Sequence, residues 1–203
     1  VAILLALVSA AQLGLASIDL GRPDLDLRAI TGIHAAWGDI RPDTGVKAAG
    51  YYVRRFVPDD LTVLSFHTRN GMELPVAEYY CGRKVLAHYD VPESALPELW
   101  AAMEQRVDVV LVDPVQVQWL SGSDLRCVCM LRRGGRVVRM VLARPELELP
   151  WRDSEISVMN AAYEREFVPR RVPLPLSAPP DFLEDLAHYQ QTVARLRILH
   201  RTG

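Results

Sequence analysis

The apolar positions between residues 46 and 113 follow two different periods in turn. Helical spacing predicts helices over residues 46–56, 73–83 and 92–107. The segments between them are short, β-branched and almost wholly apolar, which predicts buried strands at 61–66, 84–89 and 108–113. Because strands that alternate with helices form parallel sheets with right-handed crossovers, this part of the chain predicts three parallel strands in an α/β core.

The pattern changes after Asp113. Residues 124–145 predict two strands around Gly134-Gly135, a β-hairpin that we expect to extend the sheet by antiparallel strands. Two further helical patterns follow among frequent prolines, one over residues 153–167 with Asp153 as its cap, the other over residues 180–201. The expected fold is therefore α/β: a small three-layer, Rossmann-like parallel sheet extended by an antiparallel hairpin, with an N-terminal apolar helix and a C-terminal helix.

The N-terminal apolar helix is expected over residues 1–18, which contain no charged side chain. A membrane helix needs about 20 apolar residues, so the first interpretation is a truncated membrane helix. The second is a remnant of a secretory signal, with Val8-Ser9-Ala10 as its small-residue cleavage site. The third is a helix buried in the core. The first two interpretations place the following residues outside the cytoplasm.

These patterns divide the chain into four segments. They are an apolar helix at 1–18, a connector rich in Gly, Pro and Asp at 19–45, an α/β domain at 46–143 and a Pro-rich extension with two helices at 144–203.

Composition narrows the classes of function. Of the 203 residues, 50% are hydrophobic and 24% are charged, which is ordinary globular composition and excludes a disordered or fibrous chain. The 23 basic and 25 acidic residues leave a net charge of -2, so no overall positive field exists and no nucleic-acid partner is expected. Three cysteines exclude a disulfide scaffold, and since the usual ligand spacings are absent we expect neither a metal nor a cofactor.

The CxC motif and the arginines near the hairpin turn each have two interpretations, one structural and one chemical. Cys127 and Cys129 form a CxC motif on a predicted strand, where both would point to the same face; core packing is favoured over metal or redox chemistry. Four arginines surround the hairpin turn: Arg132, Arg133, Arg136 and Arg139. A solvated hairpin is favoured for them over a site for an anion or a lipid headgroup.

The candidate ligand-binding residues lie at the ends of the predicted strands. His67 and Asp90 come directly after two of the predicted strands, and Asp113 ends the third. Parallel strands would gather these side chains at one carboxyl edge, where open α/β sheets bind ligands, although strand ends also carry polar residues simply because they face water. The ordinary pKa of a histidine side chain lies near neutral pH, so His67 is suited to acid–base chemistry. The two carboxylates could orient a hydroxylated or metal-bound ligand. With Glu73 and Tyr80 as further contacts, these residues form the expected ligand site, and none of them is assigned as catalytic.

The order of these segments resembles a known family. An apolar helix and a connector precede AAGYYVRRFVPDDLTVLSF, then YYCGRKV, a long helix and VDVVLVD. This order is similar to the C-terminal extracytoplasmic domain of bacterial GT-C-type glycosyltransferases, which use polyprenyl-phosphate sugars and carry the domain after their last membrane helix. The resemblance covers about residues 1–143.

The resemblance implies a non-catalytic domain, because the family's catalytic carboxylate lies in a loop after its first membrane helix. It implies attachment to the membrane through residues 1–18, on the extracytoplasmic or periplasmic face, and engagement of a polyprenyl-phosphate sugar or a glycan acceptor. Two alternatives are kept. One is a free-standing secreted or periplasmic α/β binding module, and the other is a small α/β enzyme that uses His67, Asp90 and Asp113.

Overall fold

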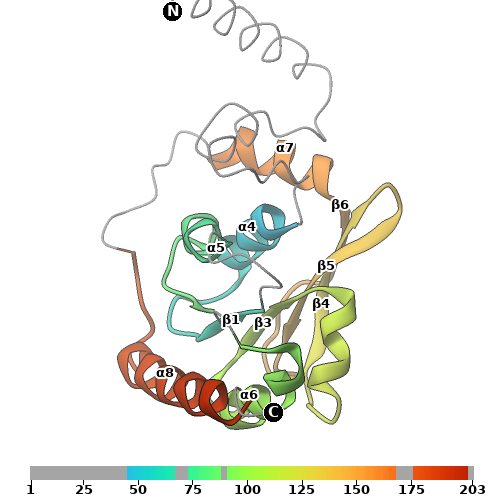
Figure 1. Cartoon of the computed structure of the whole chain (residues 1–203). Helices are drawn as coiled ribbons and strands as arrows, with labels where there is room; N and C mark the ends of the chain where they lie inside the picture. Colours follow the sequence, from blue (N-terminus) through green and yellow to red (C-terminus); the bar gives the residue numbers. More distant parts are fainter. Residues whose placement is uncertain (1–44, 67–72, 88–90, 168–175, 201–203) are drawn as a thin grey trace, which may run out of the picture. The chain divides into compact units, whose positions relative to one another are not determined.

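A six-stranded mixed sheet organises the part of the chain that the computed structural model describes, residues 45–66, 73–87, 91–167 and 176–200 (Figure 1). The strands lie in the spatial order β2-β1-β3-β5-β4-β6. They are β1 (Val63–Ser65), β2 (Leu86–Ala87), β3 (Val109–Val112), β4 (Arg126–Arg133), β5 (Arg136–Ala143) and β6 (Arg152–Glu155). The mixed α/β fold that the sequence predicts is confirmed.

The first three strands are parallel. Leu64 of β1 pairs with Leu86 on one side and with Val110 on the other. Helix α5 (Glu73–Cys81) connects β1 to β2, and helix α6 (Leu96–Met103) lies between β2 and β3, flanked by the short 3-10 turns η1 (Glu93–Ala95) and η2 (Glu104–Arg106). All four residues of β3 are buried, which is why its sequence is a continuous apolar run.

The hairpin continues this sheet in the antiparallel sense. β5 pairs with β3 on one side, with Val112 opposite Met140, and with β4 on the other. Gly134 and Gly135 connect the two arms with φ angles of 55° and 77°. A two-residue hairpin turn needs both residues in this left-handed region, where glycine is strain-free. The hairpin is therefore placed as the sequence predicts.

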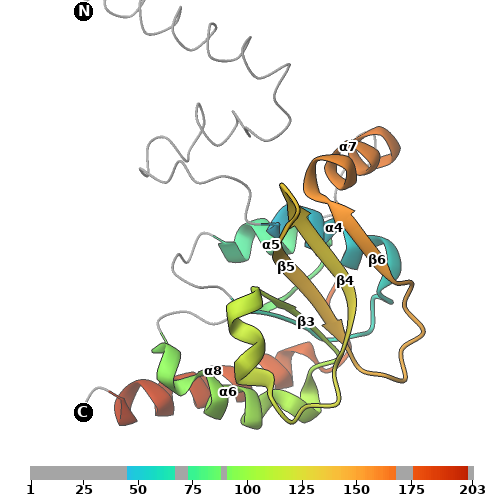
Figure 2. The same cartoon turned by 90° about the vertical axis from the view of Figure 1, so that its right-hand side faces the viewer.

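Helices cover both faces of the sheet (Figure 2). Helix α4 (Val46–Phe56) and α5 pack on one face, and α6 and α8 (Phe182–Leu199) pack on the other. Alternate residues of β3 serve the two cores: Val110 and Val112 lie in the α6/α8 core, whereas Val109 and Leu111 lie in the α4/α5 core.

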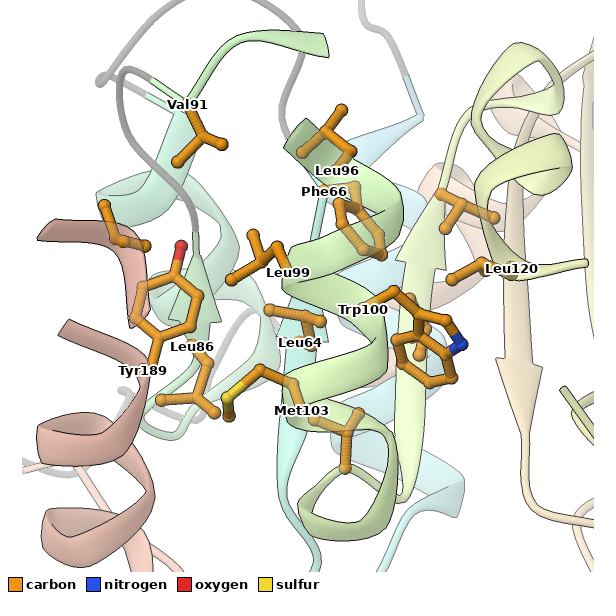
Figure 3. Close-up of a cluster of buried hydrophobic side chains, with 14 of the residues drawn as sticks. Leu64, Phe66, Leu86, Val91, Leu96, Leu99, Trp100, Met103, Leu120 and Tyr189 are labelled. Atoms are coloured by element: carbon orange, nitrogen blue, oxygen red, sulfur yellow. The ribbon is translucent and has the colours of Figure 1, made fainter. Parts of the chain in front are cut away.

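The α6/α8 core is built on one side of α6. Figure 3 shows Leu99, Trp100 and Met103 of α6 around Leu64 of β1, with Tyr189 of α8 beside them. Leu96, Leu99, Trp100 and Met103 recur at helical spacing and are all buried. Burying this stripe against the sheet is the main apolar contribution of α6 to stability.

The segment after residue 144 belongs to the same layered unit. β6 extends the sheet by pairing with β4, and α8 contributes Phe182, Val193 and Leu196 to the core under α6. Asp185 of α8 is buried, accepting hydrogen bonds from Thr62 Oγ1 (3.1 Å) and Arg106 Nη1 (2.9 Å). An amphipathic pattern cannot reveal which surface a helix covers, so this docking is visible only in three dimensions.

One boundary in this segment differs from the prediction. Asp153 was expected to cap a helix, but it lies within β6, and helix α7 (Ile156–Phe167) begins three residues later. Arg132 of β4 donates to both carboxylate oxygens of Asp153, at 2.7 and 3.0 Å. The ladder between β4 and β6, together with this ion pair, keeps the backbone at Asp153 extended.

The apolar helix expected at 1–18 and the connector expected at 19–45 lie outside the described residues, apart from Gly45. Among the helices that are described, none combines the length and the apolar composition that crossing a membrane requires.

Candidate functional site

The carboxyl ends of β1 and β3 form the candidate site. These strands are neighbours, yet the chain leaves β1 toward β2 on one side and leaves β3 toward β4 and β5 on the other. In open α/β sheets, ligands bind outside the carboxyl ends of the strands at such a change of direction. The strand order therefore supports the edge that the sequence selected.

Asp113 stands at this edge, directly after β3. It begins the 3-10 helix η3 (Pro114–Leu120) with a capping box, in which its side chain accepts from the backbone of Gln116. In return, Gln116 Oε1 accepts a hydrogen bond from the backbone N–H of Asp113 at 2.9 Å. These reciprocal bonds hold the carboxylate in one orientation.

Arg139 of β5 is the partner of Asp113 across the sheet. Its Nη1 lies 3.1 Å from Asp113 Oδ1 and also donates to the carbonyl oxygen of Phe66, the residue after β1, at 3.2 Å. The guanidinium of this β5 residue thus links the ends of β1 and β3. Since Arg139 is fully buried, the interpretation of the hairpin arginines as solvated is wrong for this residue.

A sequence signal for Arg139 existed. In β5, Arg139 is two residues before Val141 and four before Ala143, so all three share a face of the strand. Val141 and Ala143 belong to the α4/α5 core. An arginine on the same strand face as core residues indicates a buried cation that needs an anionic partner.

The start of α4 covers Arg139. Gly45 has a φ of 84°, and a Cβ built on it would lie only 2.7 Å from the Cβ of Arg139. Glycine is therefore required at this position both by its backbone conformation and by the close approach. As a result, the first turn of α4 lies directly against the buried arginine.

Two further polar groups lie near this edge. Ser65, the last residue of β1, and Gln116 are both fully buried. Among the residues that the structure describes, Ser65 Oγ and Gln116 Nε2 find no hydrogen-bond partner. Buried polar atoms are nearly always paired in folded proteins, so these two atoms are exceptions.

Among the other predicted site residues, Tyr80 is the one whose side chain the structure describes. His67 and Asp90 lie outside the described residues, and Glu73 begins α5 with its side chain also outside the description. Tyr80 lies on α5, where its ring packs edge-on against Tyr51 of α4 at a centroid distance of 5.1 Å. Of the five residues, Asp113 is the one whose described position is the carboxyl edge.

Tyr80 belongs to a contact between two helices. Lys47 Nζ of α4 lies 5.6 Å from the centroids of both the Tyr80 and the Tyr51 rings. Gly50 lets the helices approach, because a Cβ there would lie 2.6 Å from the Cβ of Tyr80. These contacts give Tyr80 a packing role between α4 and α5.

The CxC motif does not form a pair of thiols. The register of β4 against β5 shifts between Cys127 and Cys129, as a β-bulge requires. Cys127 packs against the α6/α8 core, whereas Cys129 lies in the α4/α5 core. The expectation that both point to one face is therefore wrong, and core packing accounts for each of them separately.

Thiol reactivity checks this arrangement. Burial raises the pKa of Cys81 and of Cys129 to about 12, so at pH 8 only about one molecule in ten thousand carries either thiolate. We expect iodoacetamide at pH 8 to spare both in the native chain and to modify the half-buried Cys127 first. Timed alkylation followed by peptide mass spectrometry measures this order, with the urea-unfolded chain as control. Native Cys129 that reacts as fast as in urea would contradict the bulged arrangement.

Neither a cluster of metal-ligating side chains among the described residues nor a related protein assigns a function to this edge. Within residues 45–66, 73–87, 91–167 and 176–200, no group of three or more His, Cys, Asp or Glu side chains is placed to hold a metal ion. Comparison with protein-family models, curated proteins and solved structures finds no match to this chain.

Proposed function

We propose that this chain is the non-catalytic extracytoplasmic domain of a membrane glycosyltransferase, and that it engages a lipid-linked sugar or a glycan acceptor at the carboxyl edge of its parallel strands. The observation that carries the proposal is the oriented carboxylate of Asp113 beside the point where the chain changes direction. The segment order of residues 1–143, with its resemblance to such domains and its Rossmann-like pattern, supports the same assignment.

Preorganisation is the physical argument for binding at Asp113. Its carboxylate is held by Arg139 on one side and by the capping box with Gln116 on the other. A group that is already fixed loses little conformational entropy when a ligand binds, so more of the interaction energy appears as affinity. A flexible carboxylate on an exposed loop would lack this advantage.

Attachment to the membrane is part of the proposal. Its support is the uncharged run at residues 1–18, and the extracytoplasmic location follows from the family resemblance. A polyprenyl donor lies in the bilayer, and in the resembling enzymes the catalytic carboxylate belongs to a membrane-proximal loop. The role assigned to this domain is accordingly to hold a ligand while the chemistry takes place elsewhere.

A free-standing secreted or periplasmic binding module would use the same edge. It is favoured by Val8-Ser9-Ala10, which is typical of a signal-peptide cleavage site. The reading frame upstream of Val1 separates the two: several further apolar spans favour the glycosyltransferase, and a short basic leader favours the secreted module.

A binding measurement tests the proposed site. Wild-type chain in detergent micelles is titrated with a polyprenyl-phosphate hexose by isothermal calorimetry. We expect Asp113→Asn to weaken binding by about 10- to 100-fold, because a hydrogen bond to a charged group contributes about 1.5–3 kcal/mol. Asp124→Asn is the matched control, since Asp124 is exposed just before β4, whose first residue pairs with Ala143 at the opposite edge of the sheet.

Three results would count against the proposal. They are absence of binding by the wild-type chain, equal binding by the Asp113→Asn chain, and release of free hexose by the chain alone, which would make it an enzyme. The thermal transition of each variant is recorded first, so that a binding loss is attributed only to a folded protein.

A further inference from the structure

Helix α8 carries a mostly apolar stripe on the side that faces away from the core. This α8 stripe consists of exposed residues at helical spacing: Leu183, Ala187, Gln190, Gln191, Ala194 and Ile198. The side chain of Leu183 is 79% exposed and that of Ile198 is 68% exposed. With about 3.6 residues per turn, the stripe lies opposite Tyr189, Val193 and Leu196, which pack in the α6/α8 core.

The order of residues in the α8 stripe is nearly the same from both ends. Its centre is the glutamine pair. Ala187 and Ala194 are equally distant from this centre, and so are the large aliphatic residues at the two ends, Leu183 and Ile198. A two-fold axis through the centre would therefore place Leu183 opposite Ile198 of a second copy and alanine opposite alanine. This is the self-complementary pattern of a contact between identical subunits.

The charges beside the stripe are complementary in the same arrangement. Glu184 and Arg195 flank the stripe on one side, because the eleven residues between their positions make about three turns. Antiparallel packing about a two-fold axis brings this flank of both helices together, so Glu184 would face Arg195 of the second copy, twice by symmetry. Both side chains are exposed; Glu184 remains 72% exposed although its Oε1 accepts from Arg106 at 3.1 Å.

The middle of the stripe fits a second helix better than a lipid surface. The small side chains of Ala187 and Ala194 allow two helices to approach closely. The amides of Gln190 and Gln191 both donate and accept, so each can bond to the other in the second copy and fix the register. A helix that lies on a membrane buries a continuous apolar face, which these two amides interrupt.

We propose that the α8 stripe is an interface between two copies of this chain, packed antiparallel about a two-fold axis. The interface is a surface other than the candidate site at Asp113, and it does not depend on a ligand there. Because a contact confined to one helix face is small for a protein interface, the dimer has a dissociation constant in the micromolar range.

Sedimentation equilibrium of the full chain in density-matched detergent micelles tests the interface. We expect the wild-type chain to dimerise and Ala194→Glu to weaken the dimer at least about tenfold, because the new carboxylate enters the stripe close to Glu184 of the second copy. Ala101→Glu is the matched control: Ala101 is exposed on α6, so this variant should dimerise like the wild-type chain.

Charge reversal tests the predicted pairing at the flank. Arg195→Glu should weaken the dimer about fivefold, since each copy then places two carboxylates against one another. Adding Glu184→Arg to the same chain should restore the dimer, because the opposite charges then face each other again. A double variant that is as weak as Arg195→Glu alone would contradict the pairing.

Cross-linking tests the antiparallel orientation without relying on a change in affinity. Chains with Leu183→Cys and chains with Ile198→Cys are mixed and treated with a short bismaleimide. We expect the mixture to form cross-linked dimers and neither variant alone to do so, because like positions at the ends of the stripe would lie about 22 Å apart. The wild-type chain controls for reaction of its own cysteines.

Three results would overturn the inference. One is a wild-type chain that stays monomeric at the highest concentration reached. Another is a dimer that Ala194→Glu leaves unchanged, which would assign association to another surface, such as the apolar run at residues 1–18. The third is cross-linking of the Leu183→Cys chains among themselves, which would show parallel helices.

Discussion

Arg139→Met is expected to lower the free energy of unfolding by about 3 kcal/mol. The substitution removes the cation from a buried ion pair, leaves Asp113 without its guanidinium and leaves the carbonyl oxygen of Phe66 without this donor. Breaking a buried pair from one side costs about 3–5 kcal/mol, and the lower end applies because Asp113 remains partly exposed to water. Urea denaturation followed by circular dichroism measures the change.

Arg136→Met is the matched control for this experiment. Arg136 begins the same strand, β5, and its side chain is exposed. Replacement of an exposed arginine usually changes stability by no more than about 0.5 kcal/mol. Similar losses in the two variants would show that Arg139 is not the buried link between the ends of β1 and β3.

Leu196→Ala is expected to lower the free energy of unfolding by about 3 kcal/mol, although Leu196 lies near the C-terminal end of the described chain. Leu196 of α8 is 0% exposed and packs in the core under α6. Truncation of a buried leucine removes its apolar contacts and leaves a cavity, with losses of about 2–5 kcal/mol. The comparison is Leu199→Ala, because Leu199 is 57% exposed on the same helix and should change stability little.

The same variant tests whether α8 folds together with the sheet. Tryptophan fluorescence reports on the four tryptophans of the chain, of which Trp100 lies in the α6/α8 core and Trp119 packs against it. Circular dichroism in the far ultraviolet reports on helix content. The two urea transitions of Leu196→Ala should coincide and shift together, since α6 and α8 share one core. A first transition that removes helix content and leaves the fluorescence unchanged would show that α8 is an independent appendage.

Local sequence patterns predicted most of the elements. The apolar run of β3 requires burial on both faces, and the glycine pair at 134–135 supplies the backbone conformation of a tight hairpin. The spacing of Leu96, Leu99, Trp100 and Met103 marks the buried side of α6. Each of these signals is contained within a few neighbouring residues, so no knowledge of distant contacts was needed.

Long-range pairing explains where the predictions were wrong. The bulge in β4 depends on its register against β5, and it separates Cys127 from Cys129 by adding one residue to one strand only. Asp153 is extended because β6 joins β4 and because Arg132 binds its carboxylate. In both cases the decisive partner lies on another strand, which local propensity does not include.

The candidate site shows the same division. By itself, the sequence placed Asp113 at the end of a buried strand and located the carboxyl edge, because strand ends and parallel crossovers follow from periodicity. Only the tertiary structure decided that Arg139 pairs with Asp113, that Gly45 at the start of α4 lies against the Cβ of Arg139, and that the arginine is buried while the carboxylate is 20% exposed. The physical reason is that ion pairing and exposure depend on the register between β3 and β5 and on the approach of α4 at Gly45, which are set by packing across the whole sheet.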